Sequence, residues 1–220
     1  MISFMDHTPG QGQYRDLLEY SNTMKGYREG MTDEEVDALI KDRQNAKKIS
    51  PEDLKRLADL AHEKSISLAS HDDDCTEKVE YMDSLGAVIS EFPIDMKTAH
   101  EAKEHGMFTL AGAPNVMLGH SHSGNLSARE GVENGAIDML CSDYYPAALI
   151  DAVFTLHREC KMSLPSAFAL VTANPAKAVG IDNEVGSLEV GKRADILLVR
   201  EIGCNPEGTV TTPVITRAFV

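Results

Sequence analysis

The sequence predicts an α/β fold with a parallel sheet, amounting to about five-eighths of a (β/α)8 barrel, followed by strands of a second layer. Short apolar segments alternate with helical patterns along most of the 220 residues, and this rhythm is typical of parallel α/β architecture. The apolar segments lack polar alternation, as expected of strands buried on both faces. A complete barrel typically needs about 250 residues, so the chain accounts for part of one.

Five strands are expected, at residues 2–5, 65–70, 87–90, 107–111 and 137–141. Helices are expected at residues 32–45, from 50 onward, and at 76–85, 95–105, 127–134, 147–160 and 165–172. Thr32 and Glu35 form a capping-box pattern, and Ser50-Pro51 is a helix start. Residues 11–30 show no clean period. The strand at 107–111 is expected to end at residues 112–115, and a polar loop containing residues 120–125 is expected to follow.

The C-terminal part is predicted to leave the barrel. Asn174 before Pro175 is expected to cap a short helix. Leu188 and Val190 are expected on one face of a strand, and a further strand is expected at 194–199. These patterns predict a barrel domain at residues 1–180 and a smaller second domain at 181–220.

Composition narrows the partners and the compartment. The chain carries 21 Lys and Arg against 35 Asp and Glu, a formal charge of −14, which argues against binding of a nucleic-acid backbone. No apolar run is long enough to cross a bilayer and no secretory signal pattern is present, so no membrane partner is expected. The cysteines are widely spaced, without C-x-x-C. A reducing cytoplasmic compartment is expected.

Polar side chains recur where the predicted strands end, and in a (β/α)8 barrel that rim carries the chemistry. They are His7, His71, Glu91, Asn115 and Asp143. His and Asp converging from separate strands are ligand types of a hydrolytic zinc or manganese site. Each also has a plainer interpretation: a turn cap, a core histidine, a solvated acid or a helix cap.

The metal-ligand hypothesis takes His7, His71 and Asp143, with Asp143 also a general base. The run Asp72-Asp73-Asp74 is interpreted as acids at a helix N-terminus. His120 and His122 lie in a Gly/Ser-rich loop at i,i+2 spacing, and contact with substrate or metal is one hypothesis for them.

Two segments near the C-terminus resemble the signature of the amidohydrolase superfamily. They are T-A-N-P-A-K-A-V-G (172–180) and G-S-L-E-V-G-K-R-A-D-I-L-L-V (186–199). That superfamily consists of metal-dependent hydrolases on a (β/α)8 barrel with a small β-sandwich. The resemblance implies that this chain holds about strands 4–8 of a TIM-type metallohydrolase barrel and C-terminal strands of the sandwich.

A narrower resemblance is to the phosphonate-metabolism amidohydrolases of the carbon–phosphorus lyase pathway, the PhnM family. The segments that carry it are M-D-H-T-P-G-Q (5–11), L-A-S-H-D-D-D (68–74), E-F-P (91–93), A-G-A-P-N (111–115), G-H-S-H-S-G-N (119–125) and C-S-D-Y-Y-P (141–146). The resemblance implies hydrolysis of α-D-ribose 1-methylphosphonate 5-triphosphate to the 5-phosphate and pyrophosphate. It implies a divalent metal, zinc first and manganese or iron as alternatives. For substrate contact it points to Glu91, Asn115, His120 and His122.

The chain departs from the superfamily in one respect. The superfamily places H-x-H at the end of the first barrel strand, whereas the H-x-H here is His120-Ser121-His122. We therefore expect a fragment, a truncated product, or a barrel completed by another subunit, and exposed strand edges favour a homo-oligomer. Two other functions stay open: an amidohydrolase acting on a C–N bond, such as a deaminase or deacetylase, and an inactive remnant that serves as a binding or assembly module.

Overall fold

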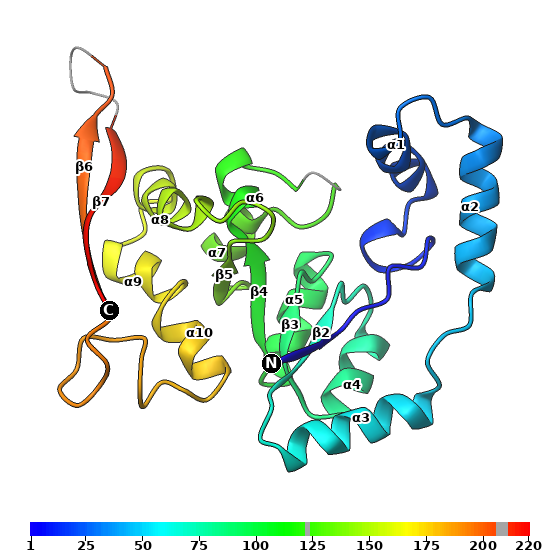
Figure 1. Ribbon diagram of the computed structural model, residues 1–220, viewed down its shortest axis with the longest axis horizontal. Coiled ribbons are helices and arrows are strands. Elements are labelled where there is room, and N and C mark those ends of the chain that lie inside the picture. The colour runs from blue at the N-terminus through cyan, green and yellow to red at the C-terminus, as the bar shows by residue number, and fades with distance from the viewer. Residues whose placement is uncertain (122–123, 206–210) are drawn as a thin grey trace. The chain divides into compact units, whose positions relative to one another are not determined.

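A computed structural model describes residues 1–121, 124–205 and 211–220. The chain divides into two compact units (Figure 1). The first unit comprises Met1–Thr109 and His122–Leu126, and the second comprises Leu110–Ser121 and Ser127–Val220. The predicted domain boundary at residue 180 stays a prediction.

The first unit is built on three parallel strands: β1 (Ile2–Phe4), β2 (Leu68–His71) and β3 (Ala87–Glu91). In the register of β2 with β3, His71 lies opposite Glu91. Because parallel strands end at the same edge of a sheet, residues that follow β1, β2 and β3 are brought together there. The predicted parallel arrangement is confirmed.

Six helical segments accompany these strands: η1 (Gly12–Tyr14), α1 (Leu17–Tyr27), α2 (Asp33–Asn45), α3 (Pro51–Glu63), α4 (Thr76–Ser84) and α5 (Met96–Glu104). Thr32 and Glu35 form the predicted capping box of α2, and Ser50 caps α3. Helix α1 lies where the sequence showed no clean period. It begins at an Asp16 cap and buries Tyr20, which packs with residues of α2.

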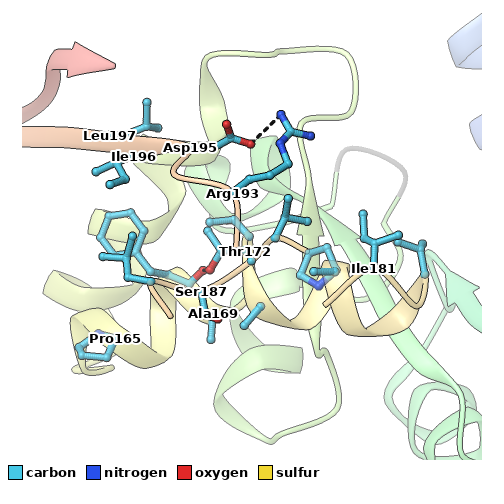
Figure 2. A pocket seen from close by; sticks show the side chains of 18 of the residues that line it. Pro165, Ala169, Thr172, Ile181, Ser187, Arg193, Asp195, Ile196 and Leu197 are labelled. Atoms are coloured by element: carbon cyan, nitrogen blue, oxygen red, sulfur yellow. Dashed lines mark hydrogen bonds and ion pairs between the residues drawn. The ribbon is translucent and has the colours of Figure 1, made fainter. Parts of the chain in front are cut away.

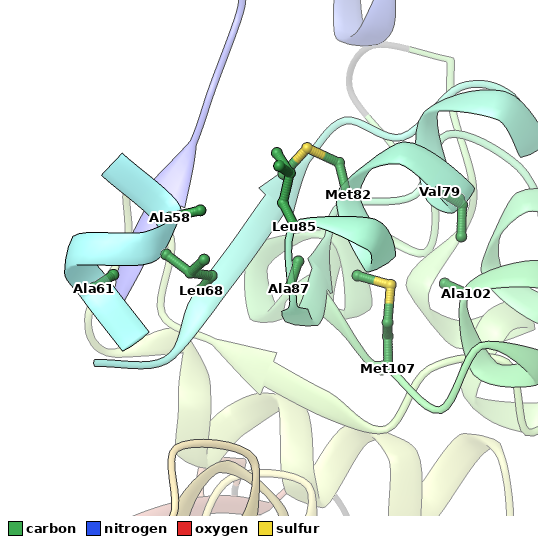
Figure 3. Close-up of a cluster of buried hydrophobic side chains, with 9 residues drawn as sticks. All are labelled: Ala58, Ala61, Leu68, Val79, Met82, Leu85, Ala87, Ala102 and Met107. Atoms are coloured by element: carbon green, nitrogen blue, oxygen red, sulfur yellow. The ribbon is translucent and has the colours of Figure 1, made fainter. Parts of the chain in front are cut away.

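Helices α3, α4 and α5 bury their apolar faces together with β2 and β3 (Figure 3). The cluster consists of Ala58, Ala61, Leu68, Val79, Met82, Leu85, Ala87, Ala102 and Met107. Leu68 and Val79 are fully buried, and burial of such a side chain contributes about 1.5–3 kcal/mol. This core anchors β2, the strand that ends at His71.

In the second unit, β4 (Phe108–Gly112), of which residues 110–112 belong to the unit, pairs in parallel with β5 (Met139–Cys141). Its helices are α6 (Ala113–Leu118), α7 (Ala128–Glu133), α8 (Ala148–Glu159), α9 (Leu164–Ala169) and α10 (Ala173–Ala178). Helix α6 corrects the expectation that residues 112–115 end the strand and lead directly into a loop. Pro114 lies in its first turn, where a missing N–H costs nothing.

A separate antiparallel pair, β6 (Ile196–Gly203) and β7 (Thr211–Phe219), ends the second unit. Two details before β6 differ from expectation. Asn174 lies within α10 instead of capping it, because its side-chain amide donates to the carbonyl of Asp138 at 2.8 Å. Leu188 and Val190 are exposed and belong to no strand.

Within the ranges described above, no helix has both the length and the apolar character needed to cross a membrane.

Candidate metal centre

His7, His71 and Asp72 lie together at the carboxyl edge of the first unit's sheet. His71 is the last residue of β2, Asp72 follows it, and His7 lies three residues beyond the end of β1. One potential ligand atom from each of these residues lies within 4.8 Å of the others. Two histidines and a carboxylate are a ligand set found in catalytic zinc sites.

The polar atoms of this cluster face each other at short distances. Asp72 Oδ2 lies 2.9 Å from His71 Nδ1 and 3.2 Å from His7 Nε2. Both His71 Nδ1 and Asp72 Oδ2 are buried, and neither has a hydrogen-bond partner among the residues that the structure describes. Burying unpaired polar atoms is costly. A cation that accepts lone pairs from all three side chains would remove this cost, so the donor set fits a divalent metal.

The backbone of Asp72 directs its carboxylate back toward the two imidazoles. Its φ of 53° lies in the left-handed region, where Asp is better tolerated than most residues. Its N–H donates to the carbonyl of Glu91 on β3 at 2.8 Å. Burial raises the pKa of Asp72, but the adjacent imidazoles of His7 and His71 outweigh it, and the pKa lies below its ordinary value. The carboxylate is therefore ionised at neutral pH, as a metal ligand must be.

A tight turn around Asp6 holds His7 in place. The Asp6 carboxylate accepts hydrogen bonds from the Thr8 N–H at 3.0 Å, the Thr8 hydroxyl at 2.5 Å and the Lys48 ammonium at 3.0 Å. Burial acts to raise the pKa of Asp6, yet these bonds together with Gln11 lower it to about 2. An ionised Asp6 thus closes an Asx-type turn beside His7.

The segment after His7 packs closely against the loop that carries Asp72. Gly12 has a φ of 53°, and a Cβ built on it would lie 3.1 Å from Asp72 Cβ. Its N–H donates to the Asp74 carboxylate at 2.6 Å. The Tyr14 ring meets the His7 ring edge-on with centroids 6.1 Å apart. This segment therefore forms a side wall of the cluster.

The sequence hypothesis named His7 and His71 as ligands, and the structure brings them together. It interpreted Asp72 as an acid of a helix N-terminus, and this was wrong. Helix α4 begins at Thr76, and the acid in its first turn is Glu77. The signal that could have identified Asp72 is its position directly after a strand-end histidine, four residues ahead of that helix.

Asp143, predicted as ligand and base, belongs to the second unit. It is exposed, follows β5 by two residues, and has a φ of 50°. A Cβ built on Gly112 would lie 2.9 Å from Asp143 Oδ2, so only glycine at the end of β4 leaves room for this carboxylate. The assignment of Asp143 as a ligand and base stays a prediction.

The remaining predicted substrate contacts have partners within their own units. Buried Glu91 accepts a 2.5 Å hydrogen bond from the Ser3 hydroxyl. The Asn115 side-chain oxygen accepts from the Ala128 N–H at 2.9 Å. Exposed His120 donates through Nδ1 to the Leu118 carbonyl at 3.1 Å. His122 lies outside the described residues. Their roles toward substrate stay predictions.

A cavity of about 1000 Å³ in the second unit contains none of these residues (Figure 2). Its wall is formed by α9, α10 and the start of β6, with Phe168 and Leu197 among its apolar side chains. Arg193 and Asp195 at this cavity form an ion pair of 2.9 Å. Because its charged groups neutralise each other, this cavity offers little chemistry for catalysis.

Parallel strands with a histidine–carboxylate cluster at their carboxyl edge define a barrel-type protein with a candidate divalent-metal site. The chain belongs to the amidohydrolase family, whose profile matches residues 12–216. Metal-dependent hydrolysis is therefore the chemistry of its class.

One curated relative matches nearly the whole chain. The α-D-ribose 1-methylphosphonate 5-triphosphate diphosphatase of Escherichia coli K12 is 39% identical over 201 residues, covering 90% of this chain and 53% of that protein. The chain thus spans about half the length of this relative. A dihydroorotase of Methanopyrus kandleri is 38% identical over 86 residues, covering 31% of this chain and 20% of that protein.

Solved structures of similar fold include a prolidase complexed with N-methylphosphonate-L-proline. Its TM-score is 0.53 at 16% identity, over 77% of this chain and 50% of that one. The ochratoxinase of A. niger gives a TM-score of 0.52 at 19% identity, over 70% of this chain and 40% of that one. These likenesses concern the fold, and they confirm the prediction of a TIM-type barrel portion.

Proposed function

We propose that this chain carries metal-binding machinery of a hydrolase of phosphonate metabolism. Its substrate would be α-D-ribose 1-methylphosphonate 5-triphosphate, and its products the 5-phosphate and pyrophosphate. The observation that carries the proposal is the buried His7–His71–Asp72 cluster, in a chain 39% identical to a diphosphatase of that specificity.

In this proposal, the two histidines act as neutral nitrogen donors and Asp72 as the anionic donor. A divalent metal, zinc in the first instance, supplies a more acidic water and neutralises charge on phosphoryl oxygens. An aspartate carboxylate is ionised at neutral pH, so no proton must be displaced from Asp72 before a cation binds. Manganese or iron would suit the same ligand types.

Asp143 is proposed as the general base that accepts a proton from the attacking water. Water adds to a phosphorus atom beside the oxygen that bridges the α- and β-phosphates, and the bond from that bridging oxygen breaks. The water oxygen ends on one product and the former bridging oxygen on the other, so that the products are the 5-phosphate and pyrophosphate. One proton of the water passes to the base. A carboxylate just beyond a strand end, for which Gly112 leaves room, suits this step.

The test begins with bound metal per chain, measured by elemental analysis on the purified 220-residue protein. Release of pyrophosphate from the triphosphate substrate is then followed with a coupled pyrophosphatase, with and without added zinc. The proposal expects tightly held metal and metal-dependent release of pyrophosphate. A protein that holds metal but releases no pyrophosphate would contradict the substrate assignment. A protein that binds no metal would leave the inactive-remnant hypothesis in its place.

A second candidate is hydrolysis of a C–N bond, which the match to a dihydroorotase over 86 residues favours. That match covers 31% of this chain, so it carries less weight than the diphosphatase. Release of ammonia, or consumption of dihydroorotate, by the metal-loaded protein would support it against the first proposal. Assembly into a homo-oligomer in the cytoplasm is a further expectation, to be tested by light scattering and cell fractionation.

A further inference from the structure

Lys78 of α4 contacts the backbone of the residues that form the metal cluster. Its ammonium donates to the carbonyl of His71 at 2.7 Å and to the carbonyl of Asp72 at 2.9 Å. The Lys78 side chain is 26% exposed. A largely enclosed ammonium held by two successive carbonyls fixes the orientation of both peptide planes.

The ammonium also lies 3.9 Å from Oδ1 of Asp73. Asp73 is fully buried, and its Oδ2 accepts hydrogen bonds from the hydroxyls of Ser70 and Ser90. Its Oδ1 has no hydrogen-bond partner in the parts of the chain described. Lys78 is thus a counter-charge for Asp73 as well as a donor to the two carbonyls.

The peptide planes that Lys78 holds determine where the ligands point. Asp72 has a left-handed backbone, a conformation that costs energy unless its surroundings maintain it. Its N–H is bonded to Glu91 on β3, while its carbonyl is bonded to Lys78. These two bonds hold the turn from both sides, and the turn sets the 2.9 Å approach of Asp72 Oδ2 to His71 Nδ1.

We propose that Lys78 is a positioning residue for the metal centre, which holds the His71–Asp72 turn in the conformation that binds the cation. The inference rests on the proposed metal-binding function. Lys78 does not touch the metal in this proposal, and it acts through the two carbonyls. Groups that orient metal ligands in this way typically account for 10–100-fold in metal affinity.

A different role would be charge compensation alone, in which Lys78 merely neutralises buried Asp73. The two roles predict different behaviour when Asp73 is neutralised together with Lys78. Asp73→Asn removes the need for a counter-charge and keeps an acceptor for the two serine hydroxyls. It does not restore donors to the carbonyls of His71 and Asp72.

The experiment measures zinc affinity by competition with a chromophoric chelator, and the visible absorption of the cobalt-substituted protein. We compare the wild-type chain with Lys78→Met, Lys78→Arg, and the double variant Lys78→Met with Asp73→Asn. Lys55→Met is the control, because Lys55 on α3 pairs only with exposed Asp59 among the interactions described. Circular dichroism establishes that each variant is folded.

We expect Lys78→Met to weaken zinc binding by about 10–100-fold and to shift the cobalt bands, and Lys78→Arg to recover most of the loss. The double variant should stay weakened. Wild-type affinity in folded Lys78→Met, or in the double variant, would overturn the inference while leaving the metal site intact. If Lys78→Met does not fold, the zinc affinity of the double variant tests the inference in its place. A wild-type chain that binds no zinc would overturn the proposed function and this inference together.

Discussion

The Nδ1 atom of His71 lies 2.9 Å from Oδ2 of Asp72, the next residue in the chain, and neither atom has a hydrogen-bond partner among the residues described. Adjacent residues reach this arrangement because Asp72 adopts a left-handed backbone that turns its carboxylate toward the preceding ring. A buried ring nitrogen and a buried carboxylate oxygen directed at one point suit a cation between them. His7 completes the cluster from a separate strand end.

Replacement of Asp72 by Asn should weaken zinc binding by more than about 100-fold, beyond the loss expected for an outer-shell residue. The amide is neutral and a poor ligand, while its size is unchanged. Chelator competition measures the affinity. Asp59→Asn, on the exposed surface of α3, serves as the matched control and should bind zinc like the wild type. Equal affinities for the two variants would exclude Asp72 as a ligand.

Replacement of Gly12 by Ala should lower the free energy of unfolding by about 1–3 kcal/mol and weaken zinc binding. The new Cβ would meet Asp72 Cβ at 3.1 Å in a residue whose φ is +53°. Urea denaturation measures the change. Gly26→Ala is the matched control, because Gly26 lies in α1 with no atom within 4 Å of a built Cβ. Gly26→Ala should raise the free energy of unfolding by about 0.5 kcal/mol. If Gly26→Ala is destabilised as much as Gly12→Ala, the steric explanation for Gly12 is wrong.

Replacement of Gly112 by Ala should reduce pyrophosphate release by about 100-fold, the scale of a displacement of about 1 Å in a catalytic group. The reason is that a Cβ at this position would lie 2.9 Å from Asp143 Oδ2. Asp143→Asn should abolish turnover. If Gly112→Ala acts through the Asp143 carboxylate, adding it to Asp143→Asn should not lower the residual rate of pyrophosphate release any further. A further loss in the double variant would show that Gly112 acts elsewhere.

The ion pair of His105 with Asp83 should make stability depend on pH. The hydrogen bond to Asp83, at 2.8 Å, raises the pKa of His105 above its ordinary value. A group whose pKa is raised by folding contributes stability below its unfolded pKa of about 6.5, and this contribution is lost as pH rises through the folded pKa. The difference in Tm between wild type and His105→Gln should therefore be larger at pH 5.5 than at pH 8.5.

The control for this comparison is Asp83→Asn, which removes the hydrogen-bonded partner and leaves Glu101 at 3.7 Å from His105. In that background, His105→Gln should have a smaller pH-dependent effect than in the wild type. A difference in Tm that grows with pH would contradict the assigned sign.

The sequence by itself determined the order of the five parallel strands and of most helices, and the strand ends at which His7 and His71 lie. These are local properties: apolar runs mark buried strands, and residues such as Thr32 and Ser50 cap helices through bonds to neighbours a few residues away. The same locality explains why α1, rich in polar residues, and α6, with Pro114 near its start, were not predicted. Their helical state depends on packing as well as on period.

Only the tertiary structure decided that Asp72 belongs to the cluster. In the sequence, the run of three aspartates resembles the acids of a helix start. In the fold, the three diverge: Asp72 turns toward the imidazoles, Asp73 is buried against serine hydroxyls, and Asp74 accepts from Gly12. The physical reason is that hydrogen bonds with Glu91 and Lys78 maintain the left-handed turn at Asp72. Glu91 reaches Asp72 only because β3 pairs with β2, and Lys78 reaches it only because α4 begins close to this turn.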